Sequence, residues 1–118
     1  MHEFAVATEL VEAALREAQH RNARRIERLE CRVGAMRQIA PEMLVDAFAL
    51  AAAGTMAEGA VLDVKTIAPI VICRSCGDRR EQREWAYRCP ACGSPDIRLE
   101  GGDELLLASV TLEIEDER

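Results

Sequence analysis

The chain has 118 residues, enough for one ordinary domain or for a small domain that carries a smaller metal module. Apolar residues make up 49% of it and aromatic residues only 3%, so Leu, Val, Ile and Ala must build a core that is thin for the length. The formal net charge of −6 argues against a strong electrostatic attraction to nucleic acid, and the longest apolar run, residues 47–53, is far too short to cross a bilayer.

The N-terminus carries no apolar leader, although the chain contains five cysteines. Clustered thiols in a reducing compartment bind metal more often than they pair as disulfides. We therefore expect a cytoplasmic protein that has no membrane partner.

The first half of the chain predicts a helix followed by a strand. The helix is expected from Phe4 to about His20, with a broad apolar stripe, and Asn22 can end it in a left-handed conformation. Apolar and charged residues then alternate in a half-buried strand, 25–34. Ile26 is out of phase with this alternation, which indicates a bulge or a contact with the end of the helix. Cys31 would lie on the apolar side as a small core residue.

A second helix and strand follow. Pro41 suits the first turn of a helix over 41–53, Gly54 ends that helix, and residues 60–67 read as a strand. The strand 25–34, this helix and this strand predict a right-handed βαβ crossover.

The last strand, 106–114, has one strictly apolar face and is expected to rejoin the sheet, after a hinge or turn at Gly101-Gly102. The fold class is therefore predicted to be α+β, with a small mixed three-stranded sheet and two helices. We expect residues 1–69 plus 100–118 to form one domain and an inserted ribbon to occupy residues 70–99.

The ribbon is predicted from two Cys-x-x-Cys pairs, formed by Cys73, Cys76, Cys89 and Cys92. Four thiolates at this spacing are typical of a closed, tetrahedral, structural zinc site. A glycine follows each pair, at Gly77 and Gly93, as a turn with positive φ would require. The alternatives are two disulfides or a dithiol redox centre.

The N-terminus, Met1-His2-Glu3, predicts a second metal site of a different kind. The imidazole of His2, its backbone nitrogen and the α-amine of Met1 can bind one ion in fused chelate rings, and Glu3 adds a backbone nitrogen and a carboxylate. A planar set of nitrogen donors suits Ni²⁺ or Cu²⁺ better than Zn²⁺. The alternative is a frayed chain end without a function.

Short motifs stand in a characteristic order along nearly the whole chain. They are Met1-His2-Glu3, Arg25-Ile26-Glu27-Arg28 before Val33-Gly34, the run from Gly54 to Ala60, the knuckles with Cys89-Pro90-Ala91-Cys92-Gly93-Ser94, and Gly102-Asp103-Glu104-Leu105. In this order they resemble the HypA (also HybF) family of hydrogenase maturation proteins. The sequence departs from the family's pattern at Ala35-Met36, where family members often have an acidic residue, and at Ala40-Pro41, where some use an acidic residue as an extra nickel ligand.

The resemblance implies a nickel metallochaperone that is not an enzyme. It implies Ni²⁺ at His2, with Glu3 and Met1 nearby, and Zn²⁺ at the four cysteines. The implied partners are the large-subunit precursor of a nickel-iron hydrogenase, a maturation GTPase of the same pathway and, in some organisms, urease accessory proteins. Exchange of the ribbon or the last strand between chains would give a homodimer.

Two alternative functions stay open at this stage. A zinc ribbon that binds nucleic acid is favoured by five arginines and by Trp85 and Tyr87, but interleaved acidic residues weaken it. The arginines are Arg74, Arg79, Arg80, Arg83 and Arg88. An adaptor protein would use only the surface of the ribbon. No catalytic residue is predicted, because a four-sulfur site leaves no position for water.

Overall fold

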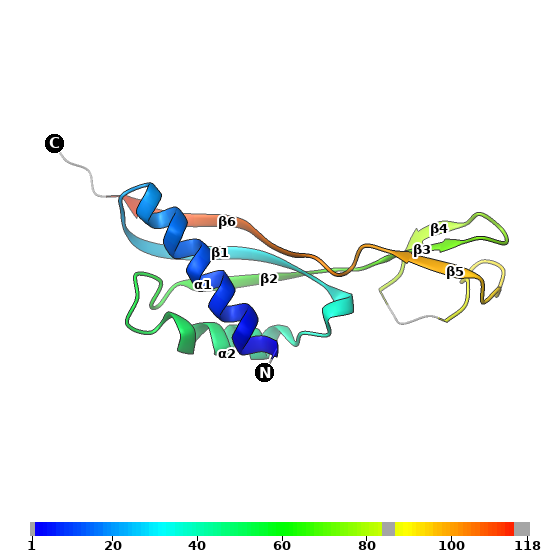
Figure 1. Ribbon diagram of the computed structural model, residues 1–118, viewed down its shortest axis with the longest axis horizontal. Coiled ribbons are helices and arrows are strands. Elements are labelled where there is room, and N and C mark those ends of the chain that lie inside the picture. The colour runs from blue at the N-terminus through cyan, green and yellow to red at the C-terminus, as the bar shows by residue number, and fades with distance from the viewer. Residues whose placement is uncertain (1, 84–86, 115–118) are drawn as a thin grey trace. The chain divides into compact units, whose positions relative to one another are not determined.

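The computed structural model describes residues 2–83 and 87–114 (Figure 1). The elements are α1 (His2–His20), β1 (Ala23–Gly34), η1 (Ala35–Arg37), α2 (Pro41–Ala52), β2 (Val61–Ile67), β3 (Ile70–Cys73), β4 (Arg79–Glu81), β5 (Ile97–Glu100) and β6 (Leu105–Ile114). Contacts along the chain divide it into two compact units. The predicted α+β class is confirmed, whereas the domain boundaries at residues 69/70 and 99/100 stay a prediction.

The first unit consists of Met1–Arg32, Ile39–Lys65 and Leu106–Arg118. Its three-stranded sheet has the order β2-β1-β6, and α1 packs against α2. Figure 1 shows β1 and β2 running in the same direction and β6 in the opposite one. The sheet is therefore mixed, as predicted, and the last strand does rejoin it.

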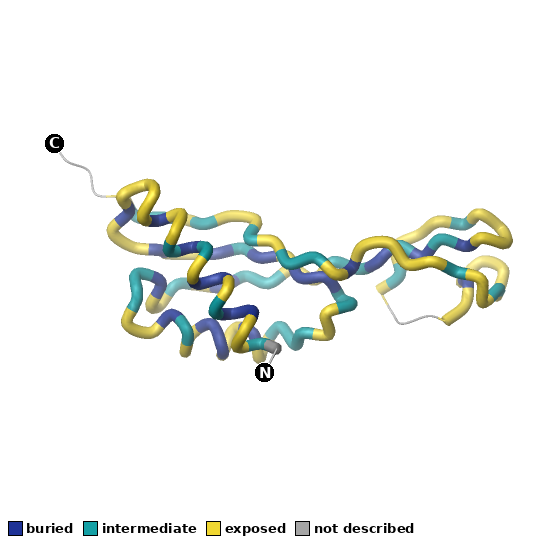
Figure 2. The backbone as a smooth tube through the Cα atoms, viewed as in Figure 1, coloured by how far each residue is buried: buried dark blue, intermediate teal, exposed yellow. Residues whose placement is uncertain are grey.

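Apolar side chains alone form the core of the described residues, as the dark segments of Figure 2 show. Phe48 and Leu44 of α2 and Ile26 and Leu29 of β1 are at most 2% exposed. Cys31 is fully buried among them, so its predicted role as a small core residue is confirmed. Burial, followed by the negative charges of Asp63 and Glu30, raises the pKa of the Cys31 thiol to about 11.

Strand β1 does not keep a two-residue alternation over its whole length. Ala23, Ile26 and Leu29 are buried at three-residue intervals, with two exposed residues in each gap. The backbone N–H of Ile26 donates a hydrogen bond of 3.0 Å to the carbonyl of Met56. Ile26 is therefore a core residue at an irregular point of the strand, as its phase in the sequence indicated.

The two helices follow their sequence signals closely. Helix α1 begins at His2, two residues before the predicted start, and Asn22 after it has the left-handed φ of 53°. Pro41 opens α2, and Gly54 after it has a φ of 76°. Positive φ is costly for most residues but not for glycine and is tolerated by asparagine, which explains both stops.

Strand β6 is more exposed than β1, the other long strand of its sheet. None of its residues is buried, and Leu106 and Ile114 are 50% and 53% exposed. Ala108 and Ser109 are both exposed, between the half-buried Leu107 and Val110. Two adjacent residues on one side shift the phase of the strand, as a bulge does, and the regular alternation predicted from the sequence ignores that shift.

The second unit consists of Val33–Gln38 and Thr66–Leu105. Its three-stranded sheet has the order β4-β3-β5, and both pairs are antiparallel. Apart from the cysteine spacing, no sequence signal predicted these short strands.

Within the second unit, two segments that are distant in sequence cross each other. The N–H of Gly34 donates to the carbonyl of Glu104, and the N–H of Met36 donates to the carbonyl of Gly102, both at 2.7 Å. Arg37 Nε donates to the carbonyl of Asp103 at 2.8 Å. These bonds tie the segment that contains Gly101 and Gly102, whose φ values are 72° and 85°, to residues 34–37.

Among the described residues, no helix is both long and apolar enough to cross a membrane.

Candidate metal centre

Two similar turns carry the four cysteines of the second unit. Cys73 is the last residue of β3, and the N–H of Gly77 donates to its carbonyl at 3.0 Å. In the second turn the N–H of Gly93 donates to the carbonyl of Cys89 at 2.8 Å. The two glycines have φ values of 78° and 79°, which confirms the reason predicted for their presence.

The sulfur atoms of the four cysteines converge on one point. All four lie within 4.8 Å of one another, with 3.6 Å between Cys73 and Cys92 and 3.7 Å between Cys76 and Cys89. Sulfurs about 2.3 Å from a tetrahedral zinc ion are about 3.8 Å apart, which fits these distances. A disulfide needs about 2.05 Å, and all five cysteines are free. The donor set therefore fits a metal ion and not a pair of disulfides.

Backbone N–H groups of the turns point at the sulfurs. Cys73 Sγ accepts a hydrogen bond from the N–H of Cys76 at 3.4 Å, and Cys89 Sγ accepts from Cys92 at 3.4 Å and Ala91 at 3.3 Å. Donors of this kind stabilise thiolates, the form in which cysteine binds metal. The turns therefore prepare the sulfurs for a cation.

Four neighbouring thiols cannot all ionise without a cation. The N–H of Cys76 is the largest influence that lowers the pKa of Cys73 to about 7. The N–H of Asp78 acts in the same direction on Cys76, but desolvation and hydrogen bonds with the other thiols outweigh it and raise the pKa of Cys76 to about 12. The pKa of Cys92 is also raised, because contacts with Cys73 and desolvation outweigh the N–H of Ser94. A dication at the centre would remove this conflict.

Contacts that sequence reasoning missed join the two turns. Ser75 Oγ and Ser94 Oγ are 2.9 Å apart, and the backbone N–H of Arg74 donates to the carbonyl of Asp96 at 3.0 Å. Arg74 and Ser75 lie between the first two cysteines, whereas Ser94 and Asp96 follow the second pair, and only the folded turns bring these residues together. The contacts hold the two halves of the centre at a fixed distance.

Four of the five arginines that favoured nucleic-acid binding have acidic partners in the second unit, whereas Arg88 donates a hydrogen bond of 3.2 Å to the carbonyl of Gly93. Acidic partners lie at 3.2 Å for Arg74–Asp96, 3.0 Å for Arg79–Glu100, 2.7 Å for Arg80–Asp78 and 3.3 Å for Arg83–Glu81. Hydrogen bonds from Arg80 and Arg79 lower the pKa values of Asp78 and Glu100. Tyr87 is 76% exposed, and Trp85 lies outside the described residues. The charges of these four arginines are locally balanced, which weakens the nucleic-acid alternative.

The second predicted site lies at the start of α1, in the first unit. Met1 and the side chain of His2 lie outside the described part of the chain. Glu3 is in the first turn of the helix, and its Oε2 accepts a hydrogen bond of 3.5 Å from the backbone N–H of Ala40. Ala40 is the N-cap of α2, so the beginnings of the two helices lie together, as Figure 1 shows.

Fold and site together define a small α+β metal-binding protein with a four-sulfur centre that has no open position for a substrate. The family described as "Hydrogenase/urease nickel incorporation, metallochaperone, hypA" matches residues 1–112. The chain belongs to this family, HypA, whose members are nickel metallochaperones of hydrogenase maturation. The resemblance drawn from the sequence motifs is thus confirmed.

Individual relatives agree with this assignment. The chain is 39% identical over 113 residues to the hydrogenase maturation factor HypA of Chlorobium limicola. The match covers 96% of this chain and 97% of that protein. It is 36% identical over 110 residues to HypA of a Picosynechococcus species, and the match covers 93% of this chain and 97% of that protein. These relatives are named as maturation factors, not as enzymes.

A solved structure supports the fold. The solution structure of the Ni metallochaperone HypA from Helicobacter pylori matches with a TM-score of 0.67, covering 98% of this chain and 100% of that one. Its sequence identity is 24%, so the match supports the architecture alone.

Proposed function

We propose that this protein binds Ni²⁺ at its N-terminus and delivers it to the large-subunit precursor of a nickel-iron hydrogenase. The ligands would come from His2, Met1 and Glu3. The observation that carries the proposal is the match of residues 1–112 to a nickel-incorporation family in a chain that opens Met1-His2-Glu3. A maturation GTPase would take part in the transfer, and urease accessory proteins would be partners where urease is a client.

The start of α1 supports a nitrogen-rich site. The helix begins at His2, and the N–H groups in the first turn of a helix have no acceptor within the helix. The amides of His2 and Glu3 can therefore lose a proton and bind a metal without breaking a helical hydrogen bond. With the imidazole of His2 and the α-amine of Met1, they supply the planar nitrogen set that Ni²⁺ prefers.

The same position makes the bound ion easy to remove. The N-terminus of a helix carries a positive partial charge, which disfavours a cation until the amides are deprotonated. Few protein atoms would hold the nickel, and a partner could approach its open side. Weak, exposed ligation of this kind is what transfer to a client requires.

Glu3 would contribute its backbone nitrogen, while its carboxylate keeps the chain end in place. The carboxylate Oε2 already accepts a hydrogen bond from the N–H of Ala40. Some family members have an acidic side chain near Ala40, but here the residue provides a backbone N–H to Glu3 and no further oxygen ligand.

In this proposal the four cysteines of the ribbon hold a structural Zn²⁺. The bound zinc would supply folding free energy on the order of 10 kcal/mol, as in comparable small sites. The distances and donors of the centre support this assignment. The protein would act in the cytoplasm, without nucleic acid or membrane as a partner.

Replacement of His2 tests the transport function in cells. The variant His2→Ala should lose hydrogenase activity, and excess nickel in the medium should restore it, because only delivery is impaired. His20→Ala is the matched control, since His20 lies at the other end of the same helix and should not affect activity. Full hydrogenase activity in His2→Ala at low nickel would contradict the proposal.

A further inference from the structure

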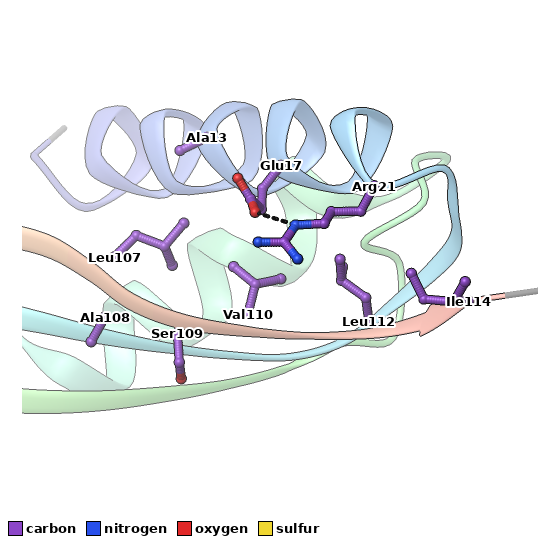
Figure 3. Close-up of a pocket in the computed structure, with 9 residues that line it drawn as sticks. All are labelled: Ala13, Glu17, Arg21, Leu107, Ala108, Ser109, Val110, Leu112 and Ile114. Atoms are coloured by element: carbon purple, nitrogen blue, oxygen red, sulfur yellow. Dashed lines mark hydrogen bonds and ion pairs between the residues drawn. The ribbon is translucent and has the colours of Figure 1, made fainter.

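Two hollows in the surface of the first unit differ in whether their arginines have acidic partners. The larger one, of about 500 Å³, lies between α1 and β6, and in it Arg21 Nε is paired with Glu17 Oε1 at 3.0 Å, as Figure 3 shows. The smaller one, which we call the arginine pocket, has a volume of about 360 Å³. It is lined by Arg24, Arg25, Thr55, Met56, Glu58 and Glu113. Among the described residues, no group forms a hydrogen bond or an ion pair with either of its two guanidinium groups.

An irregularity in β1 brings both arginines to the same hollow. In a regular strand, successive side chains point to opposite faces. Here Arg24 and Arg25 are both exposed between the buried Ala23 and Ile26. The N–H of Ile26 donates to the carbonyl of Met56, in the loop after α2, at 3.0 Å. Because a bulge turns two successive side chains to one side, the adjacent arginines face this loop together.

The loop over residues 54–60 forms one wall of the arginine pocket, and its own hydrogen bonds hold it in shape. Glu58 Oε1 accepts a hydrogen bond from the N–H of Gly54 at 3.1 Å, which directs this carboxylate toward the backbone of the loop. Gly59, with a φ of 80°, allows the guanidinium group of Arg25 to lie close, because an added Cβ would be 3.3 Å from Nη2. The wall is therefore formed before any ligand binds.

We propose that the arginine pocket binds the carboxylate of an aspartate or glutamate side chain in an exposed segment of a partner protein. A guanidinium group offers a planar fork of donors that matches the two oxygens of a carboxylate. The carboxylates of Glu58 and Glu113 balance the two arginine charges, so a ligand with one negative charge is favoured over a dianion such as phosphate. The half-buried Met56 offers an adaptable apolar surface to the methylene groups of the ligand.

The exposure of the two arginines favours a side chain of a partner protein over a free small anion. An ion pair at the protein surface contributes little free energy, so a free carboxylate would gain little from this pocket alone. A carboxylate in a protein segment adds the contacts of that segment with residues 54–60.

The arginine pocket is distant from the proposed nickel ligands. It lies beside the C-terminal end of α1, whereas His2 lies at the N-terminal end of this 19-residue helix, about 27 Å away at 1.5 Å per residue. A partner protein could thus be held without touching the ion. The inference goes beyond the proposed function and does not depend on nickel binding.

An NMR titration of the zinc-loaded, full-length protein tests the proposal. The probe is the peptide acetyl-Gly-Glu-Gly-amide, which offers one side-chain carboxylate and no charged end. It should cause saturable shifts of the Nε–H signals of Arg24 and Arg25 and of the amides of residues 54–60. The peptide acetyl-Gly-Gln-Gly-amide should cause none, and acetate and inorganic phosphate should bind more weakly than the acidic peptide.

Two variants connect these shifts to the arginine pocket. Arg25→Gln should weaken binding of the acidic peptide about fivefold, because it removes one charged donor group. Arg32→Gln is the matched control, since Arg32 is exposed on the same strand but lies outside the pocket, and it should leave the affinity unchanged.

Three results would overturn the proposal. Equal shifts at Arg32 would show that the peptide binds any exposed arginine. Unchanged affinity in Arg25→Gln would place the peptide elsewhere. Binding of acetate or phosphate as tight as that of the acidic peptide would identify a site for free anions.

The acidic end of this chain is the competing occupant, and Glu115, Asp116 and Glu117 lie outside the described residues. A triple variant that carries Glu115→Gln, Asp116→Asn and Glu117→Gln should bind the acidic peptide with unchanged affinity. An increase in affinity would identify the chain's own end as the occupant and would also overturn the proposal. None of these results bears on nickel binding by His2.

Discussion

Glu3 Oε2 accepts a hydrogen bond from the backbone N–H of Ala40, at a distance of 3.5 Å. The bond links the first turn of α1 to the N-cap of α2 across 37 positions of sequence. It therefore fixes the residue that follows His2.

The carboxylate of Glu3 is expected to position the chain end and not to bind nickel directly. Glu3→Gln keeps an oxygen acceptor for Ala40 and should change nickel affinity less than threefold. Glu3→Ala removes the acceptor, frees the first turn and should weaken nickel binding about tenfold, which corresponds to about 1.4 kcal/mol. Isothermal titration with Ni²⁺ distinguishes the cases. Equal losses in both variants would identify the carboxylate as a ligand.

Gly34 is expected to be required for the crossing of segments in the second unit. Its φ of −66° suits any residue, but a Cβ there would clash with the carbonyl of Gly102. Gly34→Ala should therefore lower the free energy of unfolding by about 2–4 kcal/mol.

Gly54 differs from Gly34 in both respects. Its φ of 76° is unfavourable for other residues, but an added Cβ would have no atom within 4 Å. Gly54→Ala should cost only about 1 kcal/mol, from backbone strain alone. Urea titrations of both variants make the comparison. A smaller loss for Gly34→Ala than for Gly54→Ala would contradict the close contact.

Removal of one sulfur should abolish metal binding by the ribbon. Cys76→Ser should reduce the zinc content of the purified protein from one ion per chain to nearly none, because a serine hydroxyl does not replace a thiolate as a ligand. Cys31→Val is the matched control and should retain one ion, since Cys31 lies in the core of the other unit. Elemental analysis by mass spectrometry measures both. Full zinc content in Cys76→Ser would rule out the four-sulfur site.

Stability should fall between about pH 9 and pH 11 because of Cys31. Its folded-state pKa of about 11 is above the ordinary 9.0, so the unfolded chain releases this proton first. The stabilisation is complete below pH 9 and is lost as the pH rises through 11, a change on the order of 2–3 kcal/mol. In Cys31→Val this part of the pH dependence should vanish. Identical pH profiles of the unfolding free energy in both proteins would contradict it.

The sequence predicted the elements that depend on local signals. Asn22, Pro41 and Gly54 mark helix ends through their own backbone preferences, and the cysteine spacing marks the metal turns. These signals act within a few residues and do not depend on contacts between distant segments. They account for the helices, the strands of the first sheet and the position of the four sulfurs.

Features that depend on contacts between distant segments could not be predicted in this way. The crossing joins Gly34 and Gly102, which are far apart in sequence. The residues around each glycine do not indicate which segment it will contact. The phase shift at Ala108 and Ser109 is invisible in a run of apolar residues. The contact between Glu3 and Ala40 likewise exists only once both helices are placed.

The central claim is that the free chain end binds nickel while sulfur holds a different ion. The most direct test is a Ni²⁺ titration of zinc-loaded protein with its native start, beside protein with extra residues before Met1. The extension removes the α-amine and leaves the fold alone. We expect at least tenfold weaker nickel binding after extension, and a similar loss in His2→Ala. Equal affinity of the native and extended proteins, or no nickel binding by the native one, would contradict the claim.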